Sequence, residues 1–362
     1  MGPRRAAKEA GHLEFRMGRT AQMLKGVRRV RGAMVRVQVI AYTPTDVIEE
    51  ADVTVGRCRE LLEKYAVTWV NVVDPDTRTV EELETLFAFP PLTLEDAQNQ
   101  DLAPKIDVYE DLIFVVARTI VWAEDIDTDQ LSLFLGRKFI VTVHDKALPQ
   151  LEDVRIGLRK KNPRMLKAGA DFLAYTILDV LVDSYFPHLD RFQSLLDQLG
   201  DEIVRRPSGE GITRLHELRT DIVRLRNSLR PQRDLFGVLS RLEIPLFHKE
   251  TRNYLRDVQD HMISALDTLD ANREIAASLM EVQATLVSNE VNEVIKVLTV
   301  LFTVTLPIAL VSSAFGMNVA FFGFNQPEGL YLALALMIVP TLALVVWMRR
   351  KGWLGRPHAA RK

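Results

Sequence analysis

Cysteine is nearly absent from this chain of 362 residues, in which Cys58 is the single thiol. One thiol can form neither an internal disulfide nor a cysteine-based zinc cluster, so a disulfide-stapled secreted domain and a zinc ribbon are both excluded. The seven histidines are scattered, and no two of them have the spacing of a metal-binding helix such as His-Glu-x-x-His. The sequence therefore gives no support to zinc-enzyme chemistry.

Basic residues are concentrated at the two ends of the chain, although the net charge is only −2. Residues 1–36 contain ten lysines and arginines against two acids, and residues 349–362 contain six against none. The body between them is left with 46 acids and 30 bases, which attracts cations rather than nucleic acid. Residues 1–34 lack the apolar segment of a signal peptide and have few aromatic residues. We expect a disordered basic leader near anionic lipid rather than a DNA-binding arm.

Residues 35–160 are expected to form an α/β domain with a mixed sheet, because short runs rich in β-branched residues alternate with turn-like segments. The expected strands cover residues 35–42, 68–73, 112–121, 131–135 and 139–144. Helical spacing of apolar residues predicts helices at 55–65 and 79–87 between these strands.

Beyond residue 160 the pattern changes to that of long helices. Residues 161–245 are expected to form a helical hairpin of the cytoplasmic domain, with helices over 168–204 and 213–239. Residues 246–306 contain neither glycine nor proline, and their apolar residues recur at helical spacing. Such a helix would reach roughly 90 Å, about three times the thickness of a bilayer core. We therefore expect a stalk helix over 246–315 that continues into a membrane, rather than an ordinary coiled coil.

Two segments near the C-terminus carry no charged residue. Residues 297–327 and 329–348 are free of Asp, Glu, Lys and Arg, with Glu328 between them. About 20 apolar residues cross a bilayer as a helix, which predicts membrane helices over 297–315 and 330–348. A buried hairpin in a soluble core is the alternative, and the basic residues that flank the second segment disfavour it.

The distribution of basic residues also predicts the orientation in the membrane. The loop of residues 316–329 has no Lys or Arg, whereas the tail of residues 349–362 begins with Arg349, Arg350 and Lys351. The positive-inside rule then places the loop outside and both termini in the cytoplasm. The expected location is the plasma (inner) membrane.

Two helices per chain cannot enclose a water-filled path, so conduction would require several copies around a central pore. The first membrane helix is the better candidate to line it, because it continues the stalk and contains polar residues, whereas the second is almost purely apolar. These polar residues are Asn292, Thr299, Thr303, Thr305, Ser312 and Ser313. Hydroxyls in membrane helices commonly bond their own backbone, so each one also has that ordinary interpretation.

The first membrane helix ends in Phe315-Gly316-Met317-Asn318. This sequence resembles the signature of the CorA-type magnesium channels, an aromatic residue and Gly-Met-Asn at the outer end of the first of two C-terminal membrane helices. The likeness covers roughly 90% of the chain, far more than a short motif can claim. It includes residues 92–96, 104–107, 141–144, 292–299, Pro307 and 351–354. Gly316 is expected to adopt the left-handed conformation that ends a helix, which would present Asn318 at the mouth.

The resemblance implies a homopentamer in the lipid bilayer, with Gly316, Met317 and Asn318 as the selectivity filter. Mg²⁺ gives up its water reluctantly, so neutral amide oxygens that hydrogen-bond the hydrated ion suit an entry filter better than carboxylates. The resemblance further assigns the pore-lining positions to Asn292, Ile295, Leu298, Leu306 and Ala309, with an acidic ring of Glu281 at the cytoplasmic mouth. No catalysis is implied.

Mg²⁺ is implied to be both the transported ion and a regulator. The family closes its pore when intracellular Mg²⁺ bridges carboxylates of neighbouring subunits, and the matching residues here are Asp96 and Asp257. Ions that bind the closed state better than the open state stabilise closure. From the residues alone, each of these acids would be an ordinary solvated surface charge.

Three departures from the family pattern bear on ion selectivity. Pro90 stands where histidine is common, Ala309 stands where a pore hydroxyl is frequent, and the outer loop has Gln-Pro-Glu at 326–328 in place of Met-Pro-Glu. The main hypothesis is regulated uptake of Mg²⁺, with Co²⁺ and Ni²⁺ as further ions. The alternatives are a zinc transporter of the same superfamily and a non-conducting, membrane-anchored sensor.

Overall fold

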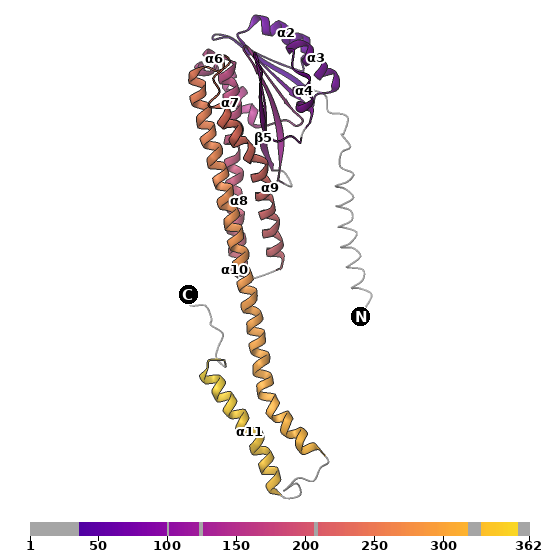
Figure 1. Ribbon diagram of the computed structural model, residues 1–362, viewed down its shortest axis with the longest axis vertical. Coiled ribbons are helices and arrows are strands. Elements are labelled where there is room, and N and C mark those ends of the chain that lie inside the picture. Colours follow the sequence, from indigo (N-terminus) through magenta and orange to yellow (C-terminus); the bar gives the residue numbers. More distant parts are fainter. Residues whose placement is uncertain (1–35, 100, 123–125, 206–208, 318–326, 354–362) are drawn as a thin grey trace. The chain divides into compact units, whose positions relative to one another are not determined.

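The computed structural model describes residues 36–99, 101–122, 126–205, 209–317 and 327–353 (Figure 1). The chain divides into two compact units. One comprises the residues up to Arg191 together with Asp221–Asp270, and the other comprises Phe192–Thr220 and the residues from Ala271 onward. The expected leader of residues 1–34 and the end of the basic tail lie outside the described residues.

The first unit is built on a seven-stranded sheet with the order β2-β1-β3-β7-β6-β5-β4. The strands are β1 Arg36–Tyr42, β2 Val47–Ala51, β3 Val67–Val73, β4 Lys105–Val108, β5 Leu112–Trp122, β6 Ile126–Gly136 and β7 Phe139–His144. Only β3 and β7 pair in parallel among these strands, and their register aligns Val70 with Val141. The mixed sheet and its five predicted strands are confirmed, whereas the edge strands β2 and β4 were not predicted.

Helices cover both faces of this sheet. Helices α2 (Val55–Lys64), α3 (Thr77–Phe87) and α4 (Pro91–Gln98) lie on one face, where Leu61 and Leu83 join the apolar core with Val70. Helix α7 (Ala170–Asp183) packs against β6 and β7, and α5 (Gln150–Arg159) packs beside it. The short α6 spans Pro163–Lys167. Alternate strand residues thus face two apolar layers, which explains the nearly continuous apolar runs of the central strands.

The remaining helices are long: α8 Tyr185–Arg205, α9 Gly209–Leu239, α10 Lys249–Gly316 and α11 Pro327–Arg350. The single helix expected over 168–204 is wrong, because α7 ends at Asp183 and α8 begins at Tyr185. Pro187 follows in the first turn of α8 and has no N–H to donate to the carbonyl of Asp183 four residues earlier. The predicted continuity of the stalk with the first membrane helix is confirmed, since α10 is uninterrupted over 68 residues.

The C-terminus of α11 is closed by a glycine turn. Gly352 has a φ of 76°, its N–H donates to the carbonyl of Arg349, and the N–H of Trp353 donates to the carbonyl of Met348. These two bonds define a Schellman cap, which satisfies carbonyls that the helix leaves without partners. The turn brings the ring of Trp353 to 6.2 Å from that of Trp347, between ring centroids.

Side chains from two helices complete the outer edge of the sheet. Strand β4 pairs with β5 only up to Val116, so the main chain of Arg118 extends beyond it. The Arg118 N–H donates to Gln232 Oε1 at 2.5 Å, the hydroxyl of Tyr185 donates to the Arg118 carbonyl, and Gln232 Nε2 donates to that hydroxyl oxygen at 2.7 Å. Gln232 is fully buried. This network fastens α8 and α9 to the sheet without a further strand.

We expect Gln232→Leu to lower the free energy of unfolding by about 2 kcal/mol, because it removes the buried Gln232 acceptor of the Arg118 N–H. The melting temperature of the purified protein should then fall by about 4–8 °C. Asn227→Leu, at an exposed position of the same helix, is the matched control. Equal melting temperatures for the two variants would contradict the role given to the network.

Candidate functional site

Two helices have the length and composition to cross a membrane. They lie within Lys249–Gly316 and Gly329–Arg350, and the most apolar windows of the two are 0% and 6% buried in the single chain. Exposed apolar side chains over such a length are unstable in water and require lipid or further protein around them. Both predicted membrane segments are therefore present as helices, although the second begins earlier than expected, at Pro327.

The threonine hydroxyls of the first membrane segment bond their own helix. Thr299 Oγ1 donates to the Ile295 carbonyl at 2.8 Å, Thr303 Oγ1 to the Thr299 carbonyl at 2.6 Å, and Thr305 Oγ1 to the Leu301 carbonyl at 2.9 Å. Their protons are already used, so only their lone pairs remain for a passing ion. The ordinary interpretation of these hydroxyls is confirmed for all three threonines.

The six residues assigned to the pore and its cytoplasmic mouth all lie on α10. They are Glu281, Asn292, Ile295, Leu298, Leu306 and Ala309, and every one is exposed. At 3.6 residues per turn, their positions fall within about one third of the helix circumference. The helix therefore brings them to one face, as a pore lining requires, and their role in conduction stays a prediction.

Gly316 does not end the helix by a left-handed turn, so that expectation is wrong. It is the last residue of α10, and Gly352 is the only glycine with a positive φ in the described ranges. A Cβ at Gly316 would meet no atom of the described residues within 4 Å, so no contact with that part of the chain requires glycine there. Met317 directly follows the helix and is 56% exposed, whereas Asn318 lies outside the described residues.

Asp96 lies on α4 and is already paired within the subunit. Its Oδ2 is 2.6 Å from Lys105 Nζ, and the same ammonium is 2.7 Å from Asp107 Oδ2. Burial opposes the charge on Lys105, but hydrogen bonds to Asp107 and Asp96 raise its pKa above the ordinary value. A cation that binds Asp96 through Oδ2 must therefore compete with the ammonium of Lys105. The sequence contains both residues but does not reveal this ion pair, which joins α4 to β4.

Asp257 lies on α10 beside an acidic cluster that sequence reasoning missed. Asp257 Oδ2 is 3.9 Å from His261 Nε2, and His261 Nδ1 is 3.1 Å from Asp183 Oδ1. One ligand atom each from Asp179, Asp183 and His261 lie within 4.8 Å of one another, a set that could hold a divalent cation. Burial and then the charge of Asp183 raise the pKa of Asp179. Asp179 and Asp183 are four residues apart, which places them on one face of a helix, and this spacing is the signal in the sequence that could have indicated the cluster.

Asp96 and Asp257 have different partners within the chain. Asp96 is engaged by Lys105, and Asp257 faces α7 with 62% of its side chain exposed. Their predicted role is a metal bridge between neighbouring copies of the chain. That role is untested and stays a prediction.

Comparisons with known proteins place the chain in a family. A family model described as CorA-like Mg2+ transporter protein matches residues 64–350. The chain is 31% identical over 327 residues to the cobalt/magnesium transport protein CorA of Thermotoga maritima, which covers 88% of this chain and 92% of that protein. It is also 21% identical over 293 residues to the zinc transport protein ZntB of Yersinia pseudotuberculosis, covering 79% of this chain and 88% of that protein.

The fold agrees with this assignment. The complete structure of the CorA magnesium transporter from Methanocaldococcus jannaschii is similar with a TM-score of 0.78 and 23% identity, covering 89% of this chain and 100% of that chain. The order of elements is the expected one: an α/β unit, a long helix and two C-terminal apolar helices. The chain therefore belongs to the CorA-like Mg2+ transporter protein family, whose members are membrane transporters of divalent metal ions and not enzymes.

Proposed function

We propose that the chain is one subunit of a homopentameric channel that admits hydrated Mg²⁺, and also Co²⁺ and Ni²⁺, into the cytoplasm. One observation carries this proposal: the exposed, uncharged outer part of the α10 face leads without interruption to Gly316 and Met317. Leu298 and Leu306 are 46% and 60% exposed on that face. In a ring of copies such residues turn toward one another around a common axis.

Each part of this face has a proposed task in the ring. Glu281 gathers cations at the cytoplasmic mouth, Asn292 offers amide oxygens, and Leu298 and Leu306 form apolar constrictions that close the path by excluding water. At the outer end, Asn318 supplies neutral oxygens to an ion that keeps its hydration shell. Lys and Arg are absent from residues 316–329, which supports an external loop with both termini in the cytoplasm.

The residues proposed to line the path favour Mg²⁺ over Zn²⁺. Hard cations prefer oxygen ligands, whereas Zn²⁺ is commonly bound by imidazole and thiolate. The six assigned residues of α10 include no histidine and no cysteine, and Cys58 is buried in the α/β unit. The relative from Thermotoga maritima, named for cobalt and magnesium, is also more similar than the zinc-named one.

Closure by intracellular Mg²⁺ is proposed to act through Asp96 and Asp257 of neighbouring subunits. The pairing of Asp96 with Lys105 lowers the repulsion between acids when the ion is absent. The cluster of Asp179, Asp183 and His261 next to Asp257 increases the negative charge on the opposite side of the bridge. An ion bound at this bridge would stabilise the closed ring by its preferential affinity for that state.

Ion flux into proteoliposomes tests the proposed function. Purified protein is reconstituted, a membrane potential that is negative inside the liposomes is applied, and Mg²⁺, Co²⁺ and Zn²⁺ are offered in turn. Mg²⁺ and Co²⁺ should enter faster than Zn²⁺ without a proton gradient. Zinc entry that depends on a proton gradient would instead indicate the zinc-transporting alternative, and no flux of any ion would indicate a non-conducting sensor.

We expect Asp257→Lys to raise the internal Mg²⁺ concentration needed for half-maximal closure about tenfold, corresponding to about 1.4 kcal/mol of lost coupling. A cation at this position repels the bridging ion. The measurement is the rate of Mg²⁺ entry as a function of internal Mg²⁺. Asp267→Lys, which changes an exposed acid of the same helix, should leave the closure curve in place. Unchanged closure in Asp257→Lys would remove Asp257 from the sensor.

A further inference from the structure

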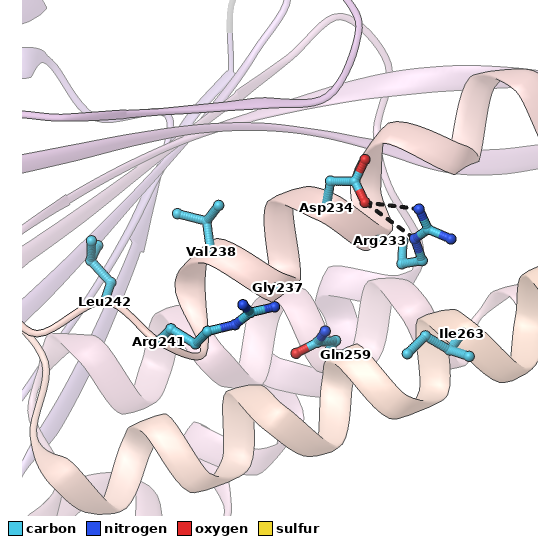
Figure 2. A pocket seen from close by; sticks show the side chains of 8 residues that line it. All are labelled: Arg233, Asp234, Gly237, Val238, Arg241, Leu242, Gln259 and Ile263. Carbon is cyan, nitrogen blue, oxygen red and sulfur yellow. Dashed lines mark hydrogen bonds and ion pairs between the residues drawn. The ribbon is translucent and has the colours of Figure 1, made fainter.

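A groove of about 630 Å³ lies between the C-terminal part of α9 and α10, within the first unit (Figure 2). Its volume is in the range of sites for small organic ligands. None of its lining residues belongs to the proposed pore or to the proposed closure site. The groove is therefore a separate feature of the cytoplasmic part of the chain.

Residue 237, which lies on the floor of the groove, is a glycine. Gly237 is a buried residue inside α9, where glycine costs about 0.5–1 kcal/mol relative to alanine. A Cβ there would stand 3.2 Å from Gln259 Nε2 and 3.5 Å from Arg241 Nη2. The missing side chain thus leaves these two nitrogen groups room to face the same space, as Figure 2 shows.

The polar groups around this floor are hydrogen-bond donors. Ser240 Oγ donates to Gln259 Oε1 at 2.9 Å, which fixes the amide so that Nε2 lies toward Gly237. The guanidinium of Arg241 has no carboxylate partner among the described residues. Arg233 and Asp234 also line the groove, but they pair with each other at 3.1 Å. The lining therefore carries one uncompensated positive charge, on Arg241.

The rest of the lining is apolar. Val238, which is 46% exposed, and Leu242 form an apolar wall on the side of Arg241, and Ile263 lies at the other end of the groove, near Arg233 (Figure 2). A ligand that fits both parts has an anionic group for the donors and a ring or other apolar body for the wall. Guanidinium forks match phosphate oxygens in pairs, and an adjacent amide N–H can reach a third oxygen of the same tetrahedral group.

We propose that this groove binds an organic phosphate of mononucleotide size, with the phosphate held by Arg241 and Gln259 and the ring against Val238 and Leu242. Such a site is independent of the ion path. It would make the cytoplasmic part of the transporter responsive to a soluble phosphorylated metabolite.

Equilibrium titration of the full-length protein in detergent with AMP tests this proposal, with EDTA present so that bound metal does not contribute. AMP should bind with a Kd below about 1 mM, and Arg241→Gln should weaken binding at least about tenfold. Arg224→Gln removes the same charge from an exposed position of α9 outside the groove and should change the Kd less than about twofold.

Three results would overturn the proposal. The first is no saturable AMP binding, and the second is equal binding by the wild type and Arg241→Gln, which would place the nucleotide elsewhere. The third is inorganic phosphate binding as tightly as AMP, which would leave no role for the apolar wall. Folding of the variants is verified by their melting temperatures.

Thiol labelling tests whether the groove is open in the assembled protein. Cys58 is the only cysteine of the chain and is fully buried, so unmodified protein should react slowly with a charged thiol reagent. Val238→Cys should react readily, and AMP should slow its reaction by at least about threefold at saturation. Absence of labelling in the assembled protein would show that a neighbouring copy covers the groove, and the proposal would then fail.

Discussion

Asn318→Ala is expected to reduce Mg²⁺ entry into proteoliposomes about 70-fold. If each of five copies loses about 0.5 kcal/mol of hydrogen bonding to the hydrated ion, the sum is about 2.5 kcal/mol at the entrance. The loss falls on an ion that keeps its water, so no other ligand replaces the amide oxygen. The measurement is the initial rate of Mg²⁺ entry at a membrane potential that is negative inside the liposomes.

The control for Asn318→Ala is Gln326→Ala, which removes another amide from the same loop. Both variants should run at the wild-type size on a sizing column, because the loop is short compared with the helices that would hold the copies together. Wild-type entry rates in Asn318→Ala would rule out Asn318 as the filter. Gly316→Ala adds a further comparison, since no atom of the described residues obstructs its Cβ. A loss of entry in that variant would then have a cause other than a clash with the described part of the same subunit.

Asp171→Ala is expected to destabilise the protein by about 3 kcal/mol and to loosen the start of α10. Asp171 is 3% exposed, and its Oδ2 accepts three hydrogen bonds at the start of α10. The donors are the His248 N–H at 3.0 Å, His248 Nδ1 at 2.9 Å and Thr251 Oγ1 at 2.6 Å. The carboxylate of α7 therefore caps the start of α10 from outside the helix, through the N–H of His248 and the hydroxyl of Thr251.

Hydrogen exchange resolves this effect from a general loss of stability. In Asp171→Ala, the exchange rates of the amides of residues 248–252 should increase over wild type by more than those of α9. In Asp171→Asn, which keeps one oxygen acceptor, the exchange rates at 248–252 should lie between those of Asp171→Ala and the wild type. Asp183→Ala, on the same helix but exposed, serves as the comparison for a simple loss of charge. Exchange at 248–252 that matches the wild type in Asp171→Ala would contradict the capping role.

The parts of the fold that were predictable are those with a long apolar pattern. The central strands are buried on both faces, and the membrane segments have no charge for many residues, so composition alone identifies them. The edge strands β2 and β4 escaped prediction because they are only five and four residues long and contain acidic or basic side chains. Their pairing depends on the neighbouring strand and not on their own propensity.

The candidate site was predictable only where its residues share one helix. Spacing along α10 places Asn292, Leu298 and Leu306 on a common face without any knowledge of the tertiary structure. The ion pair of Asp96 and Lys105 and the neighbourhood of Asp257 join different elements, so they depend on how α4, β4, α7 and α10 meet. Gly316 shows the converse case, since glycine permits a left-handed turn but does not enforce one.

The cap at Gly352 has a consequence for how the transporter sits in its bilayer. Indole rings partition to the level of the lipid headgroups, and the turn holds Trp353 and Trp347 together beside Arg349 and Arg350. These groups favour one depth in the bilayer for this end of α11. Moving it toward the bilayer centre would carry both indoles and two guanidinium groups into hydrocarbon. If α10 lines the proposed pore, we expect α11 to keep its depth in the membrane while α10 tilts during the proposed closure.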